Sequence, residues 1–223
     1  MKRTTWTGLA LVAALTATPA LASAAPGSLQ FGVPKQQAIY GELGYSGIPR
    51  IGYMAPIGPR VAIGGEFILD IGLFNSLGTG VPGTVTIAGG LPIRLLLTEN
   101  EDIIVGAEFT PGLGVSIREF GFGGFGGGST TLFTLLLHSG LDVGYKVNQQ
   151  VIVGGGVDLP LSFFLGDFTQ VAIPILFGPE VEFALTPEWS LTGDLKMGPH
   201  IIAGDFSRTD FGFKFQVGAA YSF

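Results

Sequence analysis

Apolar residues alternate with polar or small ones along the last thirteen residues of the chain. The apolar set is Phe211, Phe213, Phe215, Val217, Ala219, Tyr221 and Phe223, and the residues between them are Gly, Lys, Gln, Ala or Ser. Successive side chains of a β-strand point to opposite faces of the sheet, so a period of two places all the apolar residues on one face. This segment is therefore predicted to be a strand with one apolar and one polar face.

The same period recurs along most of the chain. It predicts further strands over Val61–Gly72, Thr84–Leu97, Ile103–Ile117, Thr131–Lys146, Val151–Phe163, Gln170–Leu185 and Trp189–Ile202. The segment Ala38–Ile57 is ambiguous, because it is consistent either with a hairpin turning near Gly47 to Pro49 or with one long strand, which would make the number of strands odd. The hairpin gives ten strands and is favoured, and eight is the alternative if this segment stays outside the sheet.

The predicted connections between strands are of two lengths. Tight turns are expected near Gly58-Pro59, Asn100, Asn148 and Thr186-Pro187, whereas longer, glycine-rich loops are expected over 74–83, 118–129, 165–169 and 203–210. The two lengths alternate along the chain, so the tight turns fall at one end of the predicted sheet and the long loops at the other. Prolines lie inside the predicted strands at Pro92, Pro111, Pro160, Pro174, Pro179 and Pro199, where each removes a backbone donor and predicts a bulge or an interruption.

Every charged residue of these strands falls on the face opposite the large aliphatic side chains. The set comprises Glu42, Arg50, Glu66, Asp70, Arg94, Glu108, Asp142, Lys146, Asp158, Glu180, Glu182, Asp194, Lys196 and Lys214, and His138 and His200 share the face. Small residues fill the rest of it, for example Gly106, Gly112 and Gly156. The other face holds most of the Phe, Leu, Ile and Val.

The two faces differ in side-chain size, and this difference predicts which face lies inside the barrel. Large aliphatic groups would overfill a narrow barrel, and a glycine-rich exterior with only 13% charged residues in the chain would be poorly soluble. The reverse orientation places the bulk in lipid and the charged groups in the lumen. No apolar run after the N-terminal region reaches the 18 or more residues of a transmembrane helix. The predicted fold class is all-β, a closed antiparallel transmembrane β-barrel of about ten strands with short periplasmic turns and longer outer loops.

The first residues have the layout of a secretory signal peptide. Lys2 and Arg3 precede an apolar run from Trp6 to about Leu15, and small residues end at Ala22-Ser23-Ala24. Cleavage before Ala25 would remove two basic residues and leave 9 basic against 17 acidic side chains, a formal charge of −8. The expected organisation is a signal peptide over 1–24, an N-terminal periplasmic segment over 25–37 and the barrel over 38–223.

The end of the chain resembles the C-terminal signature of bacterial outer-membrane β-barrels. Phe223, with Tyr221 two residues before it, closes the alternating run that contains Phe215, Val217 and Ala219, although Ala219 is smaller than the apolar residue often found there. The resemblance implies an outer-membrane location, recognition of this strand by the barrel-assembly machinery, and contact with outer-membrane lipid and lipopolysaccharide. The aromatic residues near the tight turns, Tyr53, Tyr145, Trp189, Tyr221 and Phe223, are expected at a membrane–water interface.

The chemistry of a catalytic or metal site is weakly represented in the sequence. His138 and Ser139 are neighbours in a strand and point to opposite faces, while His138 and Asp142 are about 13 Å apart along it. The chain has no cysteine, which excludes a disulfide framework or thiolate ligands, and its acidic balance argues against nucleic acid. No catalytic residue, metal or cofactor is predicted.

The predicted function is that of a non-enzymatic, monomeric outer-membrane barrel, either structural or a narrow pore. The strand residues predicted to face the lumen include nine acidic and five basic side chains, so they are expected to form ion pairs and to favour cations weakly. Two alternatives remain open. One is an outer-membrane enzyme acting on lipid or peptide at the outer rim, with His138 and His200 as the residues to test, and the other is a soluble periplasmic barrel that binds an apolar ligand.

Overall fold

The structure is a computed structural model that describes residues 28–45, 49–70, 84–120, 128–166, 169–205 and 207–223. The strands, in chain order, are β1 Ala38–Tyr45, β2 Arg50–Gly58, β3 Val61–Asp70, β4 Thr84–Gly90, β5 Ile93–Glu99, β6 Ile103–Phe120, β7 Gly128–Lys146, β8 Val151–Leu165, β9 Thr169–Pro174, β10 Leu176–Ala184, β11 Trp189–Gly204 and β12 Arg208–Ser222. Among the described residues there is no helix of the length and apolar character needed to span a membrane.

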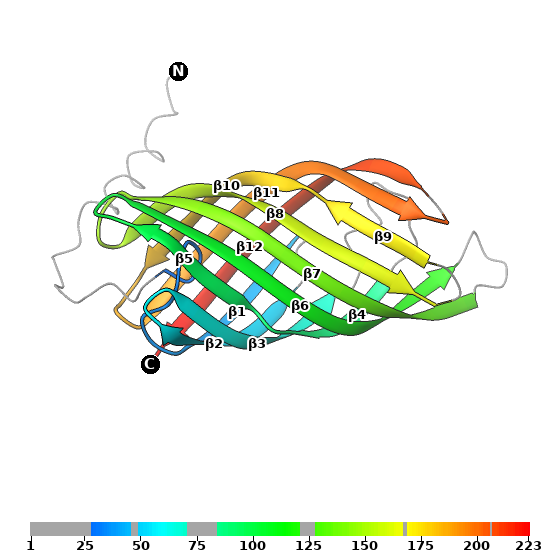
Figure 1. Cartoon of the computed structure of the whole chain (residues 1–223), viewed down its shortest axis with the longest axis horizontal. Helices are drawn as coiled ribbons and strands as arrows, with labels where there is room; N and C mark the ends of the chain where they lie inside the picture. The colour runs from blue at the N-terminus through cyan, green and yellow to red at the C-terminus, as the bar shows by residue number, and fades with distance from the viewer. Residues whose placement is uncertain (1–27, 46–48, 71–83, 121–127, 167–168, 206) are drawn as a thin grey trace, which may run out of the picture.

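The strands form a closed antiparallel barrel (Figure 1). Each strand of the wall pairs with its neighbours in chain order, and β1 pairs with β12 over eight positions, from Ala38 opposite Ser222 to Tyr45 opposite Phe215. β4 and β5 are the two halves of one wall strand between β3 and β6, and β9 and β10 are the two halves of another between β8 and β11. Counting each pair of halves once gives ten wall strands, so the predicted fold class and the favoured strand number are confirmed.

The predicted hairpin over Ala38–Ile57 is present as β1 and β2, which pair from Ala38 opposite Met54 to Glu42 opposite Arg50. Its turn near Gly47 lies outside the described residues, apart from Pro49. The predicted tight turns connect β2 to β3, β5 to β6, β7 to β8 and β10 to β11. At two of them an asparagine side chain stabilises the turn, because Asn100 Oδ1 accepts from the backbone of Asp102 and Ile103, and Asn148 Oδ1 accepts from Gln150 and Val151.

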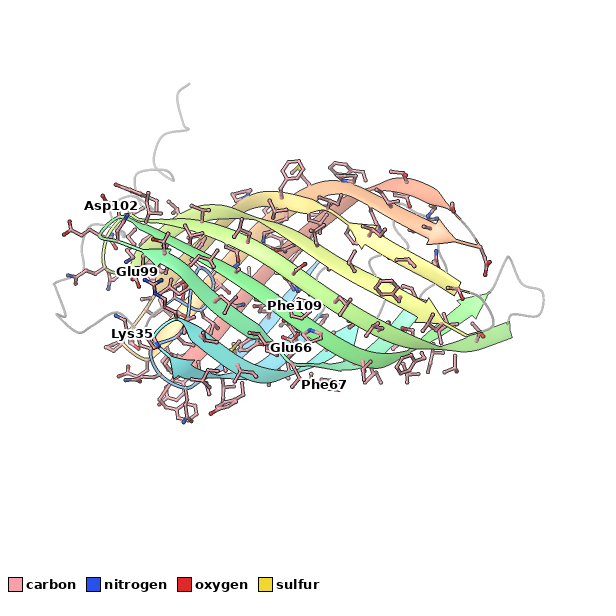
Figure 2. All side chains as sticks on the ribbon, viewed as in Figure 1. Lys35, Glu66, Phe67, Glu99, Asp102 and Phe109 are labelled. Carbon is pink, nitrogen blue, oxygen red and sulfur yellow. The ribbon has the colours of Figure 1, made fainter. Side chains whose placement is uncertain are left out.

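These four turns define what we call the tight-turn end of the barrel, and the opposite end is the loop end. The C-terminus lies at the tight-turn end (Figure 1), as do Lys35, Glu99 and Asp102 (Figure 2). The expected loops over 74–83 and 118–129 lie mainly outside the described residues.

The predicted effect of the prolines is found at two places. Pro92 lies in the break between β4 and β5, and Pro174 ends β9 before Ile175 interrupts the strand. Pro111, Pro160, Pro179 and Pro199 remain inside strands. Across the break at Pro92 the ladder is kept by backbone bonds from Leu91 N to Pro111 O and from Gly64 N to Pro92 O, both 2.9 Å.

The barrel has an apolar outside and a polar inside. Along β12, Phe213, Phe215 and Val217 are exposed whereas Lys214 and Gln216 are buried. Large apolar side chains are exposed on every strand except β9. In a chain without a second sheet or a helical layer among its described residues, the buried side of this single wall is the lumen.

Candidate functional site: the ionic lumen

Charged side chains from all ten wall strands meet in the lumen, in a group that we call the ionic belt. Its members are Glu42, Arg50, Glu66, Arg94, Glu108, His138, Asp142, Asp158, Glu180, Asp194, Lys196 and Lys214. Every acidic and basic member has a side chain at most 11% exposed. The alternation of the strands turns these residues to one face, and closure of the barrel brings that face together around an axis.

One half of the belt is built around two arginines. Arg50 Nε lies 2.5 Å from Glu42 Oε2, and Arg50 Nη1 lies 3.6 Å from Glu108 Oε1. Arg94 Nη2 lies 2.5 Å from the other oxygen of Glu108. The hydroxyl of Tyr40 donates to Glu66 at 2.7 Å. These residues come from β1, β2, β3, β5 and β6, so the contacts link half of the barrel wall through its interior.

The other half is built around two lysines. Lys196 Nζ lies 2.7 Å from Asp158 Oδ1 and 3.5 Å from Asp142 Oδ1, and it also contacts Glu180. Lys214 Nζ lies 2.9 Å from Asp158 Oδ2 and 3.1 Å from Asp194 Oδ2. Asp158 therefore receives both lysines, one on each oxygen. Charge-assisted contacts of this kind are what a buried carboxylate needs to remain ionised.

His138 joins the two halves. Its Nδ1 lies 3.9 Å from Glu108 Oε1 and its Nε2 lies 3.9 Å from Asp158 Oδ1. The imidazole is thus held between one carboxylate from each half, with 20% of its side chain exposed. His200 lies closer to the loop end, opposite Asp210 in the β11–β12 ladder, so the two histidines are not in one group.

Three carboxylates of the belt have the spacing of a metal site. Ligand atoms of Asp142, Asp158 and Glu180 all lie within 4.8 Å of one another, and all three residues are buried. The ammonium of Lys196 contacts each of them. A lysine thus supplies the positive charge that a bound cation would otherwise bring.

Most of the predicted lumen residues belong to this belt, and three do not. Glu182 is buried but binds the N-terminal segment, as described below. Lys146 lies at the tight-turn end, 2.6 Å from Glu99 and partly exposed. The side chain of Asp70 lies outside the described part. The aromatic residues expected at an interface are exposed near the tight-turn end, where Trp189 and Tyr221 have ring centroids 5.1 Å apart and Tyr221 and Phe223 6.0 Å.

An N-terminal plug lies in the lumen at the tight-turn end. We give this name to residues 28–34, of which all but Gln30 are buried. Glu182 accepts three of its donors: the Ser28 hydroxyl at 2.5 Å, and the backbone N–H groups of Leu29 and Gln30, each at 3.1 Å. The sequence predicts that segment 25–37 precedes the wall on the periplasmic side, and the structure places residues 28–34 of it inside the barrel, beside a cavity of about 820 Å³.

The plug is accommodated by glycines in the wall. Phe31 is fully buried, and side chains added at Gly144 or Gly154 would each approach its ring to 2.8 Å. The sequence does not reveal this arrangement, because Leu29, Phe31 and Val33 alternate with polar or small residues just as the residues of a short wall strand would. The only sequence signal is indirect, since Gly106, Gly144 and Gly154 leave unfilled space on the lumen face near the tight-turn end.

The fold and the site together define a class: a ten-stranded antiparallel β-barrel, closed on itself, apolar outside and ion-paired inside. No family model and no curated protein matches the chain. Solved structures to which the chain is similar include the outer membrane protease OmpT from Escherichia coli, at 12% identity and a TM-score of 0.42, covering 89% of this chain and 100% of that one.

Two further solved structures are similar at the same level. The β domain of the Bordetella autotransporter BrkA has 12% identity and a TM-score of 0.42 over 87% of this chain and 100% of its own. The toluene transporter TodX from Pseudomonas putida has 11% identity and a TM-score of 0.42 over 89% of this chain and 70% of its own. Likeness at this level is too low to inform on activity, and the assignment of the barrel rests on the strand pairing of this chain.

Proposed function

We propose that the protein is an integral outer-membrane β-barrel without enzymatic activity, whose lumen is closed in this structure by the ionic belt and the plug. The observation that carries the proposal is the reversal of the ordinary distribution of side chains. Along β11, Lys196 is 1% exposed whereas its neighbour Met197 is 38% exposed. A protein surrounded by water would gain from the opposite arrangement.

The outer surface supports a lipid environment. Phe67 of β3 lies on the outside of the wall, whereas its neighbour Glu66 lies in the lumen (Figure 2). Continuous apolar surface of this extent on a monomer marks contact with another apolar phase. In lipid every backbone group must be satisfied within the protein, and the pairing of β1 with β12 removes the open edge that would prevent this.

The interior supports a narrow path rather than a wide channel. The belt crosses the lumen from wall to wall, and the plug occupies its tight-turn end. Among the described residues the belt holds seven carboxylates, on Glu42, Glu66, Glu108, Asp142, Asp158, Glu180 and Asp194, against four cationic side chains, on Arg50, Arg94, Lys196 and Lys214. Any ion that passes meets a net negative lining, which favours cations.

Two measurements test the proposal. The purified chain is folded into phosphatidylcholine vesicles, and single-channel currents are recorded in planar bilayers. We expect a heat-modifiable band on gels, a conductance far below that of an open barrel, and a reversal potential that favours K⁺ over Cl⁻. A chain that stays monomeric in buffer without detergent contradicts the membrane assignment. A large conductance contradicts the closed lumen, and a preference for anions contradicts the acidic lining.

The partners and the orientation belong to the same proposal. We place the tight turns on the periplasmic side and the loop end outside, in contact with lipopolysaccharide, and we propose that Phe215, Val217, Ala219, Tyr221 and Phe223 are read by the barrel-assembly machinery. The supporting observation is that β12 is the strand that closes the barrel against β1. The assembled fraction of a Phe223→Ser variant in outer-membrane preparations checks this, and unchanged assembly would contradict it.

A further inference from the structure

The wall of the barrel has a break in its backbone ladder between β8 and the strand formed by β9 and β10. Asp158 is opposite Leu176, and Ser162 is opposite Ala172, so the register is the same on both sides of the break. The three positions between them carry no ladder pair: Leu159 with Ile175, Pro160 with Pro174, and Leu161 with Ile173. We call these six residues the seam.

Two opposed prolines explain the break. The N–H of Ile175 donates to Pro199 O on β11 at 2.9 Å. Because backbone donors alternate in direction along an antiparallel strand, position 174 directs its nitrogen toward β8, and position 160 opposite it directs its nitrogen toward β9. Both nitrogens belong to proline and carry no hydrogen. Both hydrogen bonds that positions 160 and 174 would exchange are therefore missing. The residue pairs on either side, 159 with 175 and 161 with 173, depend on the same two bonds and are not formed.

The lipid side of the seam is aliphatic. Leu159, Leu161, Ile173 and Ile175 lie on the outer face, because they alternate with the lumen-facing Asp158, Pro160, Pro174 and Leu176. The breaks at Pro92, Pro111 and Pro199 each keep a backbone hydrogen bond across them, whereas neither nitrogen of the opposed prolines in the seam can donate one. Compared with these other breaks in the described wall, the seam separates at the lowest cost.

The lumen between the seam and the loop end holds aliphatic side chains together with three buried hydroxyl groups, of Thr86, Ser116 and Thr134, that bond to one another. Buried aliphatic side chains line it from four wall strands: Ile68, Leu132, Leu136, Leu176 and Ile202. The ionic belt begins at the seam itself, since Asp158 lies two residues from Pro160 and His138 is opposite Pro160 in the β7–β8 ladder. An apolar molecule that enters from the loop end therefore meets charged groups at the level of the seam.

One polar atom at this level is unused. His200 is opposite Pro174 in the β9–β11 ladder, and its Nε2 is buried without a hydrogen-bond partner in the part of the chain that the structure describes. Leu176 packs beside it against Gly212. A small apolar molecule with one hydrogen-bonding group would match this lining, with its polar group on His200 and its body against the aliphatic side chains.

We propose that the seam is a lateral passage between the loop-side lumen and the lipid, and that it takes small apolar solutes carrying a single hydrogen-bonding group. This inference rests on the proposed membrane location. The ionic belt blocks the axial route for such a molecule because leaving water or lipid for a charged, narrow lumen is unfavourable. Because Pro160 and Pro174 donate no hydrogen bond to each other's strand, thermal motion can separate β8 from β9 at the seam and open the lateral route.

The test uses a reporter cysteine, since the chain has no cysteine of its own. Leu176→Cys places a thiol in the lumen beside the seam. The barrel is folded into phosphatidylcholine vesicles, and the thiol is exposed to N-(1-pyrenyl)maleimide dissolved in the lipid and, separately, to a charged methanethiosulfonate in the water. In a Pro160→Val/Pro174→Val background, which restores both donors, we expect labelling from the lipid to slow about tenfold, as two regained hydrogen bonds would require. Labelling from the water should not change.

Two controls make the result specific. A Pro92→Val/Pro111→Val background also replaces two prolines, but these lie at the break between β4 and β5 and in β6, away from the seam, and it should leave the rate from the lipid unchanged. If the seam variant fails to fold, the reporter is compared with Leu136→Cys on β7, which lies in the same part of the lumen away from the seam and should react more slowly from the lipid.

The outcomes separate this inference from the proposed function. A chain that inserts into vesicles and labels from the lipid at equal rates in the seam variant and its parent overturns the passage alone. Equal rates from the lipid at positions 176 and 136 overturn it as well. A chain that does not insert overturns the membrane location on which both depend.

Discussion

At the scale of single residues, Lys196 is the basic side chain that contacts three carboxylates in one half of the belt, as Arg50 does in the other. Its ammonium contacts Asp142, Asp158 and Glu180, and its side chain is 2% exposed. Buried ions are stable only while they remain paired, because removing one partner leaves an uncompensated charge away from water. The positive charge of Lys196 therefore offsets the mutual repulsion of three carboxylates that lie close together.

Replacing this lysine should be costly. We expect Lys196→Met to lower the free energy of unfolding by about 3–5 kcal/mol, the range found when one partner of a buried ion pair is removed. Urea unfolding in detergent micelles, followed by the loss of the compact gel band, measures it.

The matched control is Lys146→Met at the tight-turn end, whose partner Glu99 has a side chain 40% exposed. This pair is open to water, so its loss should change stability by about 1 kcal/mol or less. Similar unfolding midpoints for the two variants would show that the belt does not depend on the Lys196 contacts.

The sequence predicts the face of each charged residue but not its partner. Period two alone places Glu108, Asp158 and Lys196 toward the lumen. Whether Asp158 meets Lys196, Lys214 or both depends on the stagger between strands that are distant in sequence, and no local pattern reports that stagger. The position of His138 between Glu108 and Asp158 is unpredictable for the same reason.

At the scale of elements, the plug and the seam are the features that strand periodicity could not reveal. The alternation of apolar residues in the plug does not distinguish it from a short strand, and its place depends on one distant carboxylate, Glu182, which is 154 residues away from Ser28. The prolines were recognisable as interruptions. That Pro160 and Pro174 are directly opposite each other becomes visible only with the register of β8 and β9 known.

Loss of the Glu182 carboxylate should free the plug. In Glu182→Ala the Ser28 hydroxyl and the N–H groups of Leu29 and Gln30 lose their acceptor, at about 1.5–3 kcal/mol for each hydrogen bond to a charged group. We expect a thiol at Val33, which is buried in the native protein, to react with a water-soluble maleimide much faster in this variant.

Glu188→Ala is the control, because Glu188 lies in the neighbouring turn and its side chain bonds only locally, to Thr186. It should leave the thiol protected. If the thiol at position 33 is equally protected in both variants, the apolar contacts of Phe31 and Val33 hold the plug without Glu182.

At the scale of the whole molecule, the apolar face points outward. The stability cost of a charge on the outer wall should therefore depend on how deep in the bilayer the charge lies. Val157 is 42% exposed near the middle of β8, and Leu185 is 47% exposed in the turn after β10. A transmembrane barrel tolerates an arginine at its interface far better than one at the midplane of the bilayer. In water the two positions would be nearly equivalent.

We therefore expect Val157→Arg to reduce stability in phosphatidylcholine vesicles by about 2–4 kcal/mol and Leu185→Arg by about 0–1 kcal/mol. Reversible unfolding of the vesicle-inserted protein in guanidinium measures both. Equal costs at the two positions would mean that the outer face of the barrel is not in contact with a hydrocarbon layer.

The position of the plug also constrains the order of folding. Residues 28–34 precede β1 directly, yet they are enclosed by a wall that is complete only when β1 pairs with β12. Residues 28–34 must consequently be inside the tube by the time the last hydrogen bonds close the cylinder, or be threaded in afterwards through its mouth at the tight-turn end. Fusions to the amino terminus would therefore interfere with maturation of the cylinder, whereas insertions at the opposite rim should not.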